Sequence, residues 1–184
     1  MAASIFAGEL RTGTLRMMAV RPLSRWSMVL SKLSAVSIYS FFILFSLMGV
    51  SLILGSAFFG FGGDIIVFGP AFLGKGAGIF IMSSDTAIER LFLAYFFCTY
   101  SLVSLSAMFI MFSVIFKNST SAAIVPLGIY YTSYILDALP LMENIQRFLP
   151  TRYLMLWKYT MAQDIMWDKM LSDGVYLAIY TLLY

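Results

Sequence analysis

Long apolar runs separated by shorter charged stretches form the main pattern of the chain. A helix that spans a bilayer needs about 20 mostly apolar residues, and three runs approach or exceed that length, over residues 35–60, 91–116 and 121–139. Residues 1–10 and 174–184 are apolar but shorter, and at about 1.5 Å per residue the second covers roughly half of a ~30 Å hydrocarbon core. The pattern predicts an all-α membrane protein, a polytopic helical bundle with three full spans and a partial span at each end.

Two connections are predicted on the outer side of the membrane, over residues 61–90 and 140–173. The first is rich in glycine yet apolar, and it is too short and too often interrupted to form a further span. The second has mixed charges together with Trp157 and Trp167, and its charged positions fall on about half of a helical wheel. We expect it to form an imperfect amphipathic helix in the interface, where tryptophan and tyrosine prefer to lie.

Small residues and a proline mark two of the predicted spans. Four small residues at small-xxx-small spacing allow another helix to approach the first span closely, although a chance scatter of small residues explains the pattern equally well. They are Ser51, Gly55, Ser56 and Gly60. In the third span Pro126 is followed by Gly128. Because proline removes a backbone donor, these two residues predict a kink or a partial unwinding of the helix.

The composition agrees with a membrane protein and excludes several kinds of chemistry. The 184 residues are 61% hydrophobic and only 11% charged, against about 25% charged in a soluble domain. The chain has no histidine and one cysteine, Cys98, which leaves no intrachain disulfide and no His/Cys set for zinc. The net charge of +3 is small, and we attribute it to membrane topology rather than to nucleic-acid binding.

The charges are concentrated in residues 9–32, called the basic segment below. Four arginines and Lys32 stand there against one acid, Glu9. Such a segment next to a long apolar run is typical of the cytoplasmic side of a membrane. Lys117 lies in a short turn between the second and third spans, and the alternation of sides places it in the cytoplasm too. Both outer connections carry slightly negative charge, in agreement with this orientation.

The basic segment also has a pattern of helix breaks. Gly13 and Thr14 interrupt the apolar positions, and Thr14 is a suitable N-cap for a short helix. Pro22 ends that helix, since the residue before a proline is pushed out of the α region. Ser24 can then cap a helix that continues through Trp26 into the membrane. The order is therefore break, short helix, break, long helix.

One apparent nucleotide-binding motif is interpreted as a loop. Residues 69–75 read GPAFLGK, which fits the pattern G-x-x-x-x-G-K. The next position should be Ser or Thr to hold magnesium, but it is Gly76. No strand of the α/β type is predicted before the match, and the topology places it outside the cell. A flexible outer loop is the better interpretation.

The basic segment resembles the corresponding segment of ABC-2 transporter permeases. That family has the form E-x-x-x-G-T-L-R, a few residues, P-x-S-R and then a lysine, and the order and spacing match here at Glu9, Gly13-Thr14-Leu15-Arg16, Pro22-Leu23-Ser24-Arg25 and Lys32. The resemblance implies a six-span bundle of the type V ABC exporter kind, of which this chain holds the end of span two, spans three to five and the start of span six.

The resemblance also implies a function and partners. The chain is expected to be the permease subunit of an ATP-driven exporter in a bacterial cytoplasmic membrane, paired with a second permease copy or homologue. It is not expected to be an enzyme or to bind a cofactor, because ATP and magnesium would be held by a separate ABC ATPase subunit. The residues implied to contact that ATPase are Glu9, Arg11, Gly13, Thr14, Leu15, Arg16, Pro22, Ser24, Arg25 and Lys32.

Two other classes of protein were weighed against this interpretation. A secondary transporter or channel subunit without an ATPase is the alternative, but such proteins usually place ionisable groups near the membrane centre. The interiors of the three predicted spans contain none. An intramembrane enzyme is less consistent still, since no span has a histidine, a metal-ligand set or a carboxylate pair.

Overall fold

The computed structural model describes most of the chain after the first two dozen residues. The described ranges are 25–60, 62–68, 79–116, 118–138, 149–162 and 164–184. These residues are mostly helical, and their elements in chain order are α3 (Arg25–Phe59), β1 (Ile65–Phe68), β2 (Ile79–Met82), α4 (Ser84–Ile115), α5 (Ser119–Ala138), α7 (Pro150–Tyr153), the 3₁₀ helix η4 (Leu156–Met161) and α8 (Trp167–Leu183). The predicted helical architecture is confirmed for this part of the chain.

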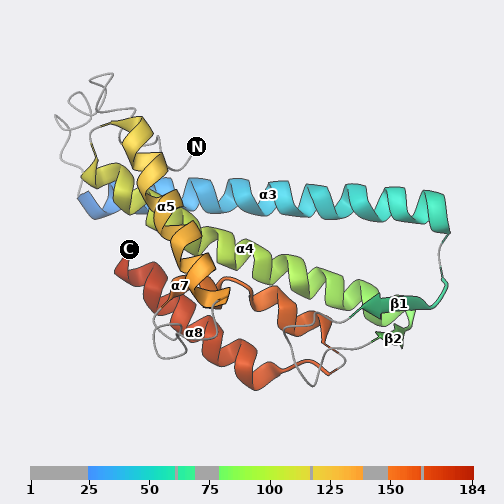
Figure 1. Ribbon diagram of the computed structural model, residues 1–184. Helices are drawn as coiled ribbons and strands as arrows, with labels where there is room; N and C mark the ends of the chain where they lie inside the picture. Colours follow the sequence, from blue (N-terminus) through green and yellow to red (C-terminus); the bar gives the residue numbers. More distant parts are fainter. Residues whose placement is uncertain (1–24, 61, 69–78, 117, 139–148, 163) are drawn as a thin grey trace.

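Two of the described helices, α3 and α4, are long and apolar enough to cross a membrane. Residues Trp26–Phe59 have a mean hydropathy of 2.2 and residues Ser84–Ile115 one of 1.9. The two helices run antiparallel side by side, with the strands at one end (Figure 1). α5 occupies the region predicted for a third span, but with 20 residues and a lower hydropathy it is not among the two. The third full span therefore stays a prediction.

Both long helices begin earlier than the apolar runs that predicted them. α3 is already helical at Arg25, ten residues before the predicted run at residue 35, and the predicted cap Ser24 lies outside the described residues. α4 starts at Ser84 rather than at residue 91, so its first two turns include charged residues. Asp85 in the first turn is favourable, because a carboxylate there interacts with the positive end of the helix dipole. Hydropathy therefore located the apolar stretch of each helix but not the polar residues before it.

A β-hairpin replaces part of the loop that we expected between the first two spans. β1 and β2 pair antiparallel, with Ile65 opposite Met82 and Phe68 opposite Ile79. Their sequences, IIVF and IFIM, are rich in the β-branched and aromatic residues that favour extended backbone. Four-residue strands are too short for a clear alternation, which is why the pattern did not reveal them.

The segment between α5 and α8 is not the single amphipathic helix that we predicted. Its described part forms α7 and η4, and α8 begins at Trp167 rather than at residue 174. Pro150 occupies the start of α7, where a proline is tolerated, and Ala162 is extended and ends η4. The charged residues of this stretch are consequently divided between short elements.

α4 lies at the centre of the arrangement. It contacts α3 along one side and packs against α5, η4 and α8 elsewhere (Figure 1). A buried cluster joins the C-terminal elements through apolar and aromatic side chains, which are Tyr153, Leu156, Tyr159, Met170 and Leu177. A second, smaller cluster joins Val36 of α3 to Ile110 of α4.

The surface of α3 is unusually apolar for a helix in water. Only 6% of its most hydrophobic window is buried within the chain. Large side chains such as Phe42, Ile53 and Phe59 are 66%, 68% and 93% exposed. An apolar surface of this extent requires a cover of lipid or of protein.

Candidate functional site

The polar contacts of α7, η4 and α8 fix the C-terminal elements against α4. Tyr159 of η4 donates a hydrogen bond of 2.6 Å to Oδ2 of Asp173 on α8. Burial raises the pKa of the Tyr159 phenol, because the anionic form loses hydration, and the bond to Asp173 raises that pKa further. The phenol therefore acts as a neutral donor at physiological pH.

Two further bonds join this region to α4. The hydroxyl of Tyr100 donates to the carbonyl of Gly174 at 3.0 Å, and the Arg90 guanidinium donates to the carbonyl of Ala162. Ala162 lies three residues after Tyr159 in sequence, and Gly174 lies one residue after Asp173. α4 thus holds both the end of η4 and the first half of α8.

Lys158 is a partly buried cation beside these groups. Its Nζ lies 5.1 Å from the centre of the Tyr159 ring, within the range of a cation–π contact. Burial lowers the pKa of Lys158, and the negative charges of Asp173 and Asp137 oppose that shift. The described residues contain no group of three or more His, Cys, Asp or Glu that could hold a metal ion. These contacts serve to position helices.

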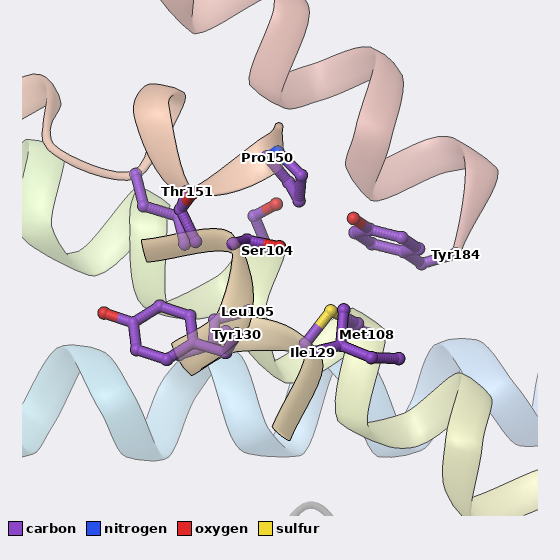
Figure 2. A pocket seen from close by; sticks show the side chains of 10 residues that line it. Ser104, Leu105, Met108, Ile129, Tyr130, Pro150, Thr151 and Tyr184 are labelled. Atoms are coloured by element: carbon purple, nitrogen blue, oxygen red, sulfur yellow. The ribbon is translucent and has the colours of Figure 1, made fainter. Parts of the chain in front are cut away.

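A small cavity lies where α4, α5, α7 and the end of the chain meet. It offers about 10 Å³ of space to a water molecule, and three of its lining hydroxyls come from Ser104, Ser133 and Thr151. These three residues are 2%, 6% and 3% exposed. Figure 2 shows Ser104 and Thr151 at the cavity, with the hydroxyl end of Tyr184 directed toward Ser104 and Pro150. The hydroxyls of Ser104, Ser133 and Thr151 are called the cavity hydroxyls below.

Thr151 differs from the other members of this site. Its Oγ1 is buried and has no hydrogen-bond partner among the residues that the structure describes. Buried polar groups in proteins are nearly always paired. No sequence pattern predicts this site, because serine and threonine within apolar runs are common and the three hydroxyls lie on separate elements.

A larger, open cleft of about 420 Å³ lies between the end of α3, β1 and the start of α4. All four residues predicted to pack helices together lie on its wall, namely Ser51, Gly55, Ser56 and Gly60. A Cβ atom added at Gly55 would meet nothing within 4 Å. Within the described part of this chain the small residues therefore border open space, and their role in packing against another helix stays a prediction.

The kink predicted in the third span falls within α5. Pro126 is fully buried, and the helix continues through it from Ser119 to Ala138 without an unwound turn. Gly128 is exposed. Partial unwinding at this proline is therefore excluded, and a bend of the axis stays a prediction.

Most of the residues implied to contact an ATPase lie outside the described residues, as do the loop motif at residues 69–75 and Lys117. The structure bears on two of them. Arg25 is the first residue of α3. Lys32 lies two turns further along the same helix and is half-buried, one turn before the Val36–Ile110 contact.

Comparison with known proteins identifies the family of the chain. All of residues 1–184 match the model of a family described as "Protein of unknown function (DUF2705)". No curated protein and no solved structure matches the chain. The described fold defines a helical protein with two helices able to cross a membrane. The chain belongs to the DUF2705 family.

Proposed function

We propose that the protein is the membrane-spanning permease subunit of an ATP-driven exporter of the ABC-2 kind. The proposal rests on the motif of the basic segment and on one structural observation. α3 is a continuous helix over the 35 residues from Arg25, the last arginine of the motif, to Phe59 at the open cleft. At about 1.5 Å per residue it is roughly 52 Å long, enough to join a cytoplasmic contact to the far side of a bilayer.

The arrangement of α3 and α4 supports the predicted orientation. The helices are antiparallel, so the start of α3 lies at the same end as the short connection from Ile115 to Ser119, and the hairpin lies at the other end (Figure 1). In the sequence, the basic segment and Lys117 therefore flank one end of the helix pair. The positive-inside rule assigns that end to the cytoplasm.

The exposed apolar surface of α3 supports a membrane location and protein partners within the membrane. Several large apolar side chains spread along its length, among them Leu30, Ile53 and Phe58, are more than half exposed in this chain. Lipid tails, the remaining spans of a six-span permease and a second permease copy would all cover such a surface. A bacterial cytoplasmic membrane is the proposed location.

The contacts of α3 suggest how ATP hydrolysis would be coupled to transport. A displacement at the basic segment would act on α3 as a rigid rod. Near its start α3 is fastened to α4 by Val36 and Ile110, with Met28, Val29 and Leu33 around them. α4 in turn contacts η4, α5 and α8. Movement would therefore pass from α3 through α4 to the C-terminal elements, while ATP and magnesium remain in the partner subunit.

Isolation from native membranes tests the partnership. The full protein, tagged and extracted in a mild detergent, should copurify with an ABC ATPase in a stoichiometric ratio, and native mass spectrometry should show two copies of each. A variant with Ala at both Arg11 and Arg16 should lose the ATPase but remain in the membrane. Recovery of the protein without any nucleotide-hydrolysing subunit would contradict the proposal.

A further inference from the structure

The hydroxyl of Thr151 is exceptional among the buried hydroxyls of the described residues. Ser101 donates to the carbonyl of Phe97 at 3.0 Å, and Thr160 donates to the carbonyl of Trp157 at 2.7 Å. Both use a carbonyl three or four residues upstream, as serine and threonine in helices commonly do. Thr151 is the second residue of the four-residue α7, so its own helix offers no such carbonyl. The hydroxyl instead borders the small cavity.

The dimensions and lining of the cavity indicate what it holds. A single water needs about 10–15 Å³ of such space and two to four polar partners. The cavity provides about 10 Å³ and hydroxyls from Ser104, Ser133 and Thr151, which come from three different elements. The rest of its lining is mostly apolar, including Leu105 and Met108.

We propose that this cavity is the site of one ordered water molecule that bridges Thr151 to Ser104 and Ser133. The water accepts or donates at each hydroxyl and thereby joins α7 to α4 and α5. The water supplies a hydrogen-bond partner for the Thr151 hydroxyl, which is buried and has no partner among the described residues. Tyr184 borders the same cavity (Figure 2). The inference does not depend on the permease proposal, because it rests only on the geometry of the cavity and on the unpaired hydroxyl.

The sign of the change in Tm on substitution of Thr151 tests the water bridge. Thr151→Val replaces the hydroxyl by a methyl group of similar size. If water bridges the hydroxyl, this variant loses the bridge and its Tm in detergent micelles falls by about 2–4 °C. If the cavity is dry, removal of an unpaired buried hydroxyl leaves the Tm unchanged or raises it, and the proposal is overturned.

A double-mutant comparison tests whether the hydroxyls share one water. Thr151→Val combined with Ser104→Ala should lower the Tm by less than the sum of the single effects, since either substitution alone breaks the bridge. The matched control combines Thr151→Val with Ser101→Ala. Ser101 is buried one turn away on α4 but is bonded to its own helix, so these effects should add. Additivity in both pairs would contradict the bridge.

Methyl NMR of the unsubstituted protein keeps the proposal testable if the variants fail to fold. In the full protein labelled at threonine methyl groups, the Thr151 methyl should show a nuclear Overhauser effect to a long-lived water. Thr160 is fully buried and bonded to Trp157, so its methyl should show none. Absence of the signal at Thr151 would overturn the assignment of a water to this cavity.

Discussion

The hydroxyl of Tyr159 donates a 2.6 Å hydrogen bond to the carboxylate of Asp173, fourteen residues further along the chain. This bond joins η4 to the first turns of α8, and Tyr159 is only 8% exposed. A hydrogen bond to a charged group contributes about 1.5–3 kcal/mol. The bond is therefore one of the contacts that hold the C-terminal elements together.

Removal of this bond should destabilise the protein. Tyr159→Phe keeps the ring and leaves the partly buried carboxylate without its donor, so the free energy of unfolding should fall by about 1.5–3 kcal/mol. Chemical unfolding in detergent micelles, followed by circular dichroism, measures the change. Tyr134→Phe is the control, because that ring is 46% exposed, and it should have little effect. Equal stability of the two variants would refute the structural role of the bond.

The same bond should produce a dependence of stability on alkaline pH. Burial and the bond to Asp173 raise the pKa of Tyr159 above its ordinary value of 10.0. A group with a raised folded-state pKa contributes its full stabilisation below the unfolded pKa and loses it as the pH rises through the folded pKa. Above pH 10 the wild-type protein should therefore lose stability faster than Tyr159→Phe. The free energy of unfolding of both proteins, measured between pH 8 and about 12, tests this expectation. Parallel curves for the wild-type protein and Tyr159→Phe would disprove it.

Two leucines of α8 provide a matched test of the C-terminal core. Leu177 is fully buried in the aromatic cluster, whereas Leu171 is 63% exposed. Leu177→Ala should lower the free energy of unfolding by about 2–5 kcal/mol, because it leaves a cavity, and Leu171→Ala should change it by less than about 0.5 kcal/mol. Thermal unfolding of both variants in the same detergent measures the difference. A larger loss for Leu171→Ala would mean that α8 packs through its other face.

The helices could be predicted from the sequence because each one is indicated by an apolar run of many residues. The apolar runs located α3, α4 and α5. The apolar pattern does not predict the beginning of α8, because Asp168 and Asp173 are typical of an outer polar segment. In the structure these residues form the polar first turns of an otherwise apolar helix.

The sites were much less predictable from sequence. The cavity hydroxyls and the Tyr159–Asp173 bond join positions that are distant in sequence and have no characteristic spacing. The irregular backbone around α7 and η4, which brings Thr151 to the same cavity as Ser104, follows from tertiary packing of α7 against α5 and α8 and of η4 against α4. The open cleft is the exception, since the small-residue spacing identified four of its lining residues, although it did not reveal that they border open space.

Orientation in the membrane can be tested with single cysteines in a Cys98→Ser background. Asn118 lies between α4 and α5 and Asp164 precedes α8, and both are exposed. With the basic end in the cytoplasm, an impermeant thiol reagent applied to intact cells should label Asp164→Cys but not Asn118→Cys. Permeabilised cells should give label at both positions. If only Asn118→Cys were labelled in intact cells, the orientation would be the opposite of the predicted one. The basic segment would then lie outside the cytoplasm, where ATP is not available.

The central claim is that the basic segment transmits ATP hydrolysis to the membrane helices, and ATPase activity of the complex tests it most directly. The complex of the full protein with its ATPase subunit, in lipid nanodiscs, should hydrolyse ATP several times faster than the ATPase alone. Arg16→Ala should remove most of that stimulation and leave insertion intact. Arg152→Ala, which changes an exposed arginine on α7, should retain it. Full stimulation with Arg16→Ala, or an equal loss with Arg152→Ala, would contradict the account.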